Sequence, residues 1–355
     1  MEESTALLQL LSSRGASRAL VRRVLREVWL GGGSTHEALR RLRRDHRIEC
    51  PSVRVVRGDR VAIDRLGLEI VDARSPKFPP LLREIPDPPA ALFVRGDAST
   101  MTRPLSVAVV GSRRATAFGK AFATALATDL ARAKITVVSG LALGVDGAAH
   151  EGALGGGGVT VAVMGGGHAN VYPRSHRTLA NRVIANGALI SEYGPMNRAR
   201  PEQFPERNRI ISGLCAAVVV VEATRRSGSL ITARLALEQG REVMAVPGAV
   251  DGGAHGGCHR LIRQGAQLVE GVADVLEALG LALPETPAMR EPTDPLHRRV
   301  FAALSTSEIT LHDIVESLGM TIDTVLSALV ELELEGFVAP HRGGYIRRPL
   351  TTADT

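Results

Sequence analysis

Two arginines stand directly after a glycine and a serine at the end of a short apolar run (107–110). Four apolar residues that end in a glycine predict a buried parallel strand turning tightly into a helix. A helix start offers free backbone N–H groups and a partial positive charge, which suit a phosphate. We therefore predict that one phosphate of a larger ligand is bound by Gly111, Ser112, Arg113 and Arg114. A tight turn with solvent-facing arginines is the alternative.

A dinucleotide-binding turn would need the pattern G-x-G-x-x-G and an acidic residue at the end of the next strand. This glycine spacing is absent, and the second apolar run ends in Ser139 and Gly140. A nicotinamide cofactor is therefore not expected. Ser139 and Gly140 instead join the residues predicted to line the ligand site.

The richest polar segment is Phe204-Pro-Glu-Arg-Asn-Arg209, just before an apolar helix. The guanidinium forks of Arg207 and Arg209 suit phosphate oxygens. The Asn208 amide can read a base edge, and the Phe204 ring can stack on a base. The segment favours a nucleic acid ligand, the alternative being a helix turn whose arginines pair with neighbouring glutamates.

Asp146 and His150 lie four residues apart, so they share one face of a predicted helix. They could form an acid–base pair or part of a metal site, but no third metal ligand is evident nearby. We expect instead a buried Asp–His hydrogen bond that fixes the loop. Arg174, which follows Tyr172 and Pro173, could add another phosphate contact or lie free on the surface.

Other chemistry is not indicated by the motifs. The G-x-S-x-G pattern of a serine nucleophile is absent. His255, Cys258 and His259 are close in sequence, but their spacing fits no standard zinc site. We therefore expect no metal, no cofactor and no catalytic residue.

Apolar runs alternate with helical segments between residues 105 and 279. The runs expected to be strands are 107–110, 135–138, 159–164, 188–191, 216–221, 242–246 and 267–269. Helices are expected at 117–133, 145–153, 176–186 and 229–239. This βαβ repetition predicts an α/β fold, an extended Rossmann-like doubly wound parallel sheet, with its ligand site at the carboxyl ends of the strands.

The two ends of the chain show other patterns. Residues 1–48 have helical apolar spacing, and Ser34 can cap a helix at 35–44. Residues 50–71 indicate short strands or irregular structure, and the prolines between 76 and 89 indicate a rigid extended connection.

A proline-rich linker is expected at 281–295. Beyond it, three helices and a hairpin predict a winged helix-turn-helix, with helices at 296–304, 311–318 and 321–335 and the hairpin turn at Gly343-Gly344. The predicted domains are a basic helical domain (1–70), a Rossmann-like DNA-binding domain (71–282) and a linker with the winged helix (283–355).

The charge is unevenly distributed along the chain. Residues 1–60 hold thirteen arginines and seven acidic residues, a net charge of +6, which is also the net charge of the whole chain. Such a basic segment favours a polyanion, or is an arginine-rich solvated surface. The expected recognition helix, 321–335, has acidic residues and no lysine or arginine, which favours protein contacts over duplex DNA.

The composition indicates a protein of the cytoplasm with no membrane partner. Hydrophobic residues make up 45% of the chain, but no apolar run is long enough to span a membrane. The first residues lack a signal-peptide pattern, and three widely spaced cysteines predict no disulfide framework.

Ordered motifs between residues 76 and 270 match one known family. They include Phe78-Pro79, Val107–Arg113, Ser139-Gly140 with Asp146 and His150, Tyr172-Pro173, Ser191–Tyr193, Phe204–Ile211, Ser227–Arg234 and Ala245–Gly248. On these motifs the chain resembles the DNA-processing protein A (DprA or Smf) family of bacterial transformation proteins. Its first and last segments resemble the helical SAM-like domain and the winged helix of that family.

The resemblance implies a non-enzymatic binder of single-stranded DNA that protects incoming strands and helps to load the recombinase RecA during natural transformation. It places the phosphate pocket at the Gly111-Ser112-Arg113 turn and at Phe204, Arg207, Asn208 and Arg209, with Arg174 nearby. It also implies a homodimer formed through the Rossmann-like domain. We place this dimer surface at 258–268.

Two rival functions are less favoured. A nucleoside-monophosphate phosphoribohydrolase shares the extended Rossmann fold, but its Pro-Gly-Gly-x-Gly-Thr-x-x-Glu motif has no counterpart. The nearest segment, Ser227–Arg234, lacks the glutamate in register. A transcriptional regulator would read duplex DNA with the winged helix, and the acidic recognition helix argues against that.

Overall fold

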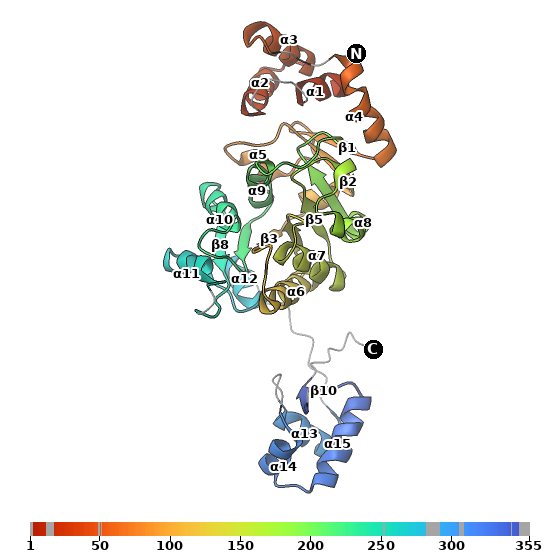
Figure 1. The fold of residues 1–355 in the computed structure, drawn as a ribbon, viewed down its shortest axis with the longest axis vertical. Coiled ribbons are helices and arrows are strands. Elements are labelled where there is room, and N and C mark those ends of the chain that lie inside the picture. Colours follow the sequence, from red (N-terminus) through yellow and green to blue (C-terminus); the bar gives the residue numbers. More distant parts are fainter. Residues whose placement is uncertain are drawn as a thin grey trace. The chain divides into compact units, whose positions relative to one another are not determined.

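The computed structural model describes residues 3–11, 18–48, 50, 52–250, 253–281, 292–304, 309–341 and 343–347. The chain divides into two compact units, Met1–Ala282 and Leu283–Thr355 (Figure 1). Most of the linker predicted at 281–295 lies outside the described residues. None of the described helices is both long and apolar enough to cross a membrane.

A nine-stranded sheet with the order β1-β2-β6-β5-β4-β3-β7-β8-β9 forms the centre of the first unit. Its seven parallel strands lie at the predicted apolar runs. They are β3 (Ser106–Val110), β4 (Thr136–Ser139), β5 (Thr160–Val163), β6 (Gly187–Ser191), β7 (Ala217–Val220), β8 (Glu242–Ala245) and β9 (Gln267–Leu268). The predicted α/β fold with a large parallel sheet is confirmed.

Helices cover both faces of this sheet, which is why its central strands are buried and largely apolar. Along β3, Val107 and Val109 belong to the core on one face, and Ala108 and Val110 to the core on the other. The first face carries α6 (Ala117–Arg132), α7 (Val145–Gly155), α8 (Arg177–Asn186) and α12 (Val272–Ala278). The second face carries α5 (Pro80–Glu84), α9 (Gln203–Gly213), α10 (Ser229–Glu238) and α11 (Gly256–Arg263).

The region before the parallel strands differs from the prediction. The proline-rich stretch contains α5, because Pro80 stands at a first helical position, where its missing N–H costs nothing. Two further strands, β1 (Glu69–Asp72) and β2 (Ala91–Gly96), extend the sheet: β2 pairs antiparallel with β6, and β1 pairs antiparallel with β2. No strand was predicted at β2, whose four buried residues show no alternation.

The prediction of short strands or irregular structure at 50–71 is wrong for most of that range. The helix α4 (Val53–Leu66) occupies it and ends at Gly67, which adopts the left-handed conformation of a helix C-terminus. Val56 and Ile63 are seven residues apart and pack with Leu8 and Phe93. This helical spacing outweighs the strand propensity of the valines.

The N-terminal helices α1 (Glu3–Leu11), α2 (Arg18–Leu30) and α3 (Thr35–Asp45) enclose a core that also includes Ala90 and Ala91 at the start of β2. The Ser34 side chain accepts a hydrogen bond from the Glu37 N–H, as predicted for the α3 cap. These helices are therefore joined to the sheet by a common core.

The second unit is a winged helix, as predicted. Its elements are α13 (Pro295–Ala303), α14 (Leu311–Leu318), α15 (Ile322–Leu334), β10 (Val338–His341) and β11 (Gly344–Arg347). They enclose their own core, in which Phe301 and Phe337 meet edge to face. The hairpin turn includes Gly343, whereas Gly344 already belongs to β11.

Candidate nucleic-acid interface

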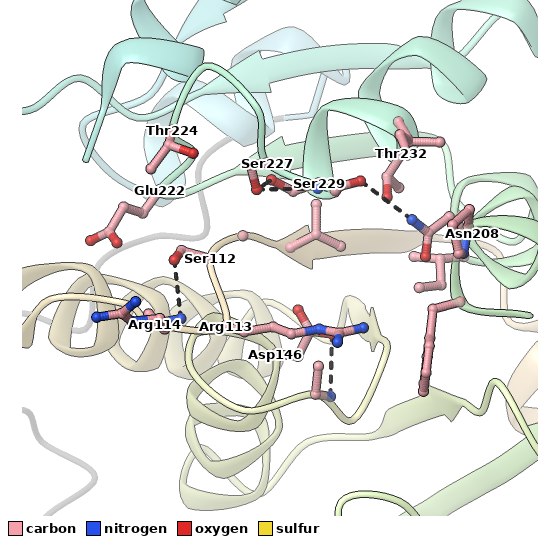
Figure 2. Close-up of a pocket in the computed structure, with 18 of the residues that line it drawn as sticks. Ser112, Arg113, Arg114, Asp146, Asn208, Glu222, Thr224, Ser227, Ser229 and Thr232 are labelled. Carbon is pink, nitrogen blue, oxygen red and sulfur yellow. Dashed lines mark hydrogen bonds between the residues drawn. The ribbon is translucent and has the colours of Figure 1, made fainter. Parts of the chain in front are cut away.

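A cleft of about 940 Å³ opens at the carboxyl ends of β3 and β7. Three segments form its walls: the turn after β3, the first turns of α9, and the loop from β7 into α10 (Figure 2). Of the predicted site residues, the cleft is lined by Gly111, Ser112, Arg113, Arg114, Phe204, Arg207 and Asn208. Residues far apart in the sequence thus meet where a doubly wound sheet places its ligands.

Helical spacing explains which α9 residues face the cleft. Phe204, Arg207 and Asn208 stand at positions i, i+3 and i+4, so they share one helix face. Arg209 is two residues beyond Arg207 and therefore points to nearly the opposite side. The positions of Arg207 and Arg209 in the sequence therefore already place them on different sides of the helix.

An exposed arginine and two aromatic rings form one side of the cleft. The Arg113 guanidinium carbon lies 4.7 Å from the centroid of the Phe204 ring, in cation–π contact. The Tyr172 ring, 56% exposed, lies 5.6 Å from Phe204, centroid to centroid. Figure 2 shows Arg113 and Arg114 extending from the turn in opposite directions. Tyr172 was not among the predicted site residues, because only the fold brings it beside Phe204.

The helix start expected to hold a phosphate is already occupied. The Thr116 hydroxyl caps α6 by accepting a hydrogen bond from the Gly119 N–H. The buried Glu222 carboxylate accepts hydrogen bonds from the Thr116 N–H at 3.0 Å and from its hydroxyl at 2.6 Å. Glu222, 106 residues later in the chain, thus takes the two donors of Thr116, and the phosphate contact predicted for Gly111, Ser112, Arg113 and Arg114 stays a prediction.

A hydroxyl-rich wall faces the arginines across the cleft. It consists of the loop after β7 and the first turn of α10, where the Ser227 and Ser229 hydroxyls lie 2.8 Å apart. The Asn208 amide donates a hydrogen bond to the Gly228 carbonyl from α9. The N-terminus of α10 thus lines the cleft, as does Thr116 at the N-terminus of α6.

Arg207 is 3% exposed and joins three segments below the cleft surface. Its Nη1 donates hydrogen bonds to the Gly140 carbonyl at 2.7 Å and to the Val163 carbonyl. Burial lowers the pKa of Arg207 to about 10, so the side chain remains charged at neutral pH. Arg207 therefore ties α9 to the ends of β4 and β5.

Gly140 has a steric role in this arrangement. A Cβ at this position would lie 2.6 Å from the Asp146 carboxylate and 2.7 Å from the Arg207 guanidinium. Any larger residue would push these two charged groups out of place. Gly140 thus supports the cleft from below and does not line it.

The predicted hydrogen bond between Asp146 and His150 is absent. The Asp146 carboxylate accepts from the N–H groups of Gly140 and Ala142, at 3.1 and 3.4 Å. Burial raises the pKa of Asp146, and the charge of Arg207 opposes this rise. His150 bonds instead to the Thr160 hydroxyl at 2.7 Å, and burial lowers its pKa to about 3. Asp146 belongs to the first turn of α7 and reaches back to the loop before it.

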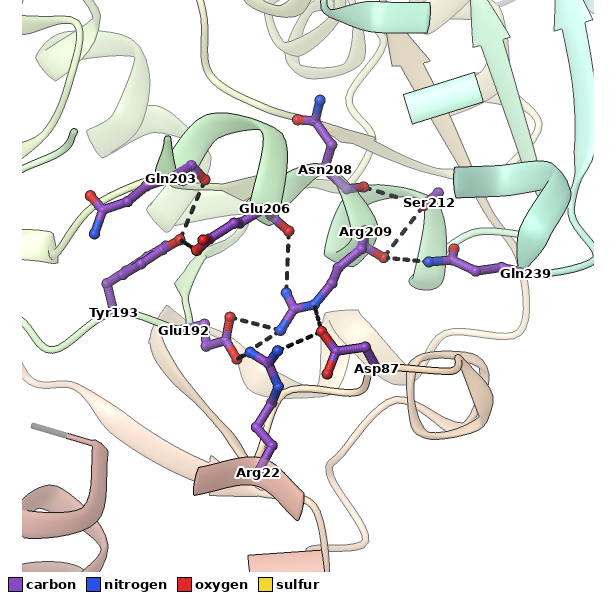
Figure 3. A network of polar contacts seen from close by, with 10 residues as sticks. All are labelled: Arg22, Asp87, Glu192, Tyr193, Gln203, Glu206, Asn208, Arg209, Ser212 and Gln239. Atoms are coloured by element: carbon purple, nitrogen blue, oxygen red, sulfur yellow. Dashed lines mark hydrogen bonds and ion pairs between the residues drawn. The ribbon is translucent and has the colours of Figure 1, made fainter. Parts of the chain in front are cut away.

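The structure places Arg209 in a buried ion-pair network outside the cleft (Figure 3). Its Nη2 lies 2.8 Å from both carboxylate oxygens of Glu192, and its Nε lies 3.1 Å from Asp87. Arg22 of α2 pairs with the same two acidic residues. The network therefore joins the N-terminal helices, the loop before β2, the end of β6 and α9.

Two other predicted site residues also lie outside the cleft. The buried Ser139 hydroxyl donates a hydrogen bond to the Val109 carbonyl and so joins β4 to β3. Arg174 is exposed, two residues after Tyr172, but does not line the cleft. Within the part of the chain that the structure describes, no group of three histidine, cysteine or acidic residues could hold a metal ion.

A Rossmann-like sheet with a basic, aromatic and hydroxyl-lined cleft, followed by a winged helix, defines a class of nucleotide- or nucleic-acid-binding proteins. Within this class, the chain belongs to the DNA recombination-mediator protein A family, whose model matches residues 69–280. The model of the DprA winged helix domain matches residues 284–344.

Known relatives resemble most of the chain. Protein Smf of Escherichia coli is 41% identical over 288 residues, covering 78% of this chain and 77% of that protein. The X-ray structure of DprA from Streptococcus pneumoniae has a TM-score of 0.66 at 33% identity, covering 78% and 98% of the two chains. A Helicobacter pylori DprA structure, described for its single-stranded DNA binding mode, has a TM-score of 0.53 at 30% identity, covering 57% and 92%.

Removing Arg209 should destabilise the fold without removing a cleft side chain. We expect Arg209→Ala to lower the free energy of unfolding by about 3–5 kcal/mol, because Glu192 would stay buried with fewer partners. Urea unfolding followed by circular dichroism measures this change. The control is Arg182→Ala, an exposed arginine paired with Glu151, for which we expect a loss of about 0–1 kcal/mol. Equal losses for the two variants would contradict the structural role of Arg209.

Proposed function

We propose that this protein is a single-stranded DNA-binding recombination mediator and that the cleft at the ends of β3 and β7 holds the strand. One observation carries the proposal. The exposed Arg113 lies over the Phe204 ring beside Tyr172, opposite a wall of hydroxyls and a helix N-terminus. A DNA strand has both groups that these residues can bind: a phosphate for the arginine and the face of a base for the aromatic ring.

Stacking on Phe204 explains why a single strand should be preferred. In a duplex, both faces of each base are covered by neighbouring base pairs, so no base can reach a ring in a cleft without unpairing. A single strand exposes its bases at little cost. The Asn208 amide already bonds to Gly228, so we propose little dependence on base sequence.

The predicted site residues divide into four groups. We propose direct DNA contacts for Gly111, Ser112, Arg113, Arg114, Phe204 and Asn208. Arg207 and Gly140 position the cleft walls, because their contacts are with carbonyl groups and with each other. Ser139 and Arg209 hold the fold together. Arg174 is exposed near Tyr172, and we propose a contact with a phosphate just outside the cleft.

We also propose that the cleft has no catalytic turnover. Asp146 and Glu222 are the acidic side chains among its lining residues, and both accept hydrogen bonds from loop groups. Neither is free to act as a general base. A phosphoribohydrolase would need the glutamate of its Pro-Gly-Gly-x-Gly-Thr-x-x-Glu motif, and the nearest segment, Ser227–Arg234, lacks it in register. Release of a free base from a nucleoside monophosphate would support that enzyme instead.

The proposal also includes the protein partners of this chain. We propose that the protein acts in the cytoplasm, protects incoming strands and helps to load RecA during natural transformation. For the homodimer we propose the surface of α11 and β9, where Leu268 is 41% exposed. Val250, in the loop before α11, is 89% exposed and lines one hollow with them. The backbone of β9 lies at an edge of the sheet. Cys258 itself is buried, so the other residues of 258–268 would form the contact.

For the winged helix we propose a protein partner with a basic surface. Residues 283–355 contain six arginines, no lysine and eleven acidic residues, a net charge of −5. Along α15, the exposed apolar side chains Ile322, Leu326, Val330 and Leu334 recur every four residues. An acidic helix with an apolar stripe repels phosphates but complements a basic amphipathic protein surface.

The preference for single strands can be tested by fluorescence anisotropy with a labelled dT oligonucleotide and a duplex of equal length. We expect the single strand to bind at least about tenfold more tightly, because only unpaired bases can stack. Its affinity should fall as salt rises, since phosphate contacts release counterions. Equal affinity for both forms, or an affinity that does not change with salt, would contradict the proposal.

Two substitutions test the cleft itself. We expect Phe204→Ala to weaken single-strand binding by about 1–3 kcal/mol through lost stacking. We expect Arg113→Ala to reduce the slope of log affinity against log salt by about 0.7, the loss of one phosphate contact. Arg182→Ala removes an exposed, ion-paired arginine outside the cleft and serves as the control. If both cleft variants bind like this control, the DNA site lies elsewhere.

The winged helix can be tested with the full chain carrying Leu326→Asp and Val330→Asp. Both side chains are exposed, so the fold should be retained. We expect the affinities for single-stranded and duplex DNA to change by less than about twofold. A loss of duplex binding larger than this would show that α15 reads DNA.

A further inference from the structure

The most basic part of the chain lies outside the cleft. The lining of the cleft begins at Val110, whereas the net charge of +6 lies in residues 1–60. The N-terminal helices are nevertheless attached to the body that carries the cleft. They share a core with Ala90 and Ala91, and Arg22 pairs with Asp87 and Glu192. Their charge is therefore held in a fixed place relative to the cleft.

Much of this charge lies on one side of α3. Ala38, Leu39 and Leu42 pack into the N-terminal core. Arg40 and Arg43 are exposed on the other side of the helix, and the exposed Arg47 follows just after its end. We name these three arginines the α3 basic face. Beside it lies a shallow hollow of about 620 Å³, lined by Glu37, Arg40, Arg41, Arg43 and Arg44.

The arginines of α3 differ in their partners. Arg41 pairs with Glu27 at 2.7 Å, and Arg44 pairs with Asp45 at 2.6 Å. Among the described residues, no carboxylate lies within ion-pair distance of the α3 basic face. Like charges three or four residues apart destabilise a helix, and the negative end of the helix dipole offsets this only in its last turn. A bound polyanion would relieve the remaining repulsion.

We infer that the α3 basic face binds the phosphodiester backbone of DNA outside the cleft. This inference rests on the proposed function and lengthens the path of the strand beyond it. Trp29 is the one Phe, Tyr or Trp in the sequence of residues 1–60, and its ring is covered by Arg74 at 4.3 Å. The contact is therefore with phosphates alone, independent of base sequence, and adds affinity only when the strand is long enough to reach it.

The test measures the affinity of the full chain for dT oligonucleotides from about 6 to about 40 nucleotides. The variant is Arg40→Ala, Arg43→Ala and Arg47→Ala together. We expect it to bind the shortest oligonucleotide like the wild type and the longest about tenfold more weakly. The salt slope for the longest should fall by about 2, as for three lost phosphate contacts. A duplex of the same length, measured in parallel, shows whether this face takes single or double strands.

The control variant is Arg132→Ala, Arg182→Ala and Arg234→Ala together. It removes the same charge from exposed arginines that are paired with Asp129, Glu151 and Glu238. Equal weakening by both triple variants, or none by the α3 variant, would overturn the inference. Lysines at the three α3 positions should keep most of the long-strand affinity. Failure of the wild type to bind the shortest oligonucleotide would count against the cleft and not against this face.

Discussion

The buried guanidinium of Arg207 is the interaction on which the cleft depends. It holds the carbonyls at the ends of β4 and β5 while the adjacent residue, Asn208, reaches the opposite wall. A charge without solvent is costly, and carbonyl groups together with the nearby Asp146 carboxylate offset that cost. With this arginine in place, α9 presents Phe204 toward Arg113. The exposed side chains can then bind and release a ligand while the walls of the cleft stay in place.

Most of the fold could be predicted from the sequence, because strands buried on both faces are nearly continuous apolar runs. All seven parallel strands, the α3 cap and the winged helix follow from such local patterns. The helix α4 was missed because its valines favour strands, although Val56 and Ile63 have helical spacing and pack with Leu8 and Phe93. The strand β2 was missed for a related reason, as its pairing with β6 involves residues about a hundred positions away.

The candidate site was predictable in its location but not in the roles of its residues. A doubly wound sheet fixes where its loops meet, so the turn after β3 and the start of α9 could be joined from the sequence. Whether an arginine faces solvent or a carbonyl is decided by partners distant in the chain. Glu222 accepts from Thr116 at the start of α6, and Glu192 and Asp87 pair with Arg209. Local motifs contain no signal for such long-range pairs.

The position of Arg113 over Phe204 has a consequence for kinetics. The ring face that a base would use is already in contact with a cation, so an arriving base replaces one favourable contact with another. The net free energy per base is the difference between the two, and the same exchange runs backward when the strand leaves. Departure of a base from Phe204 is therefore eased, because the Arg113 contact forms again as the base leaves. Easy release suits a protein that is proposed to pass its DNA to a recombinase.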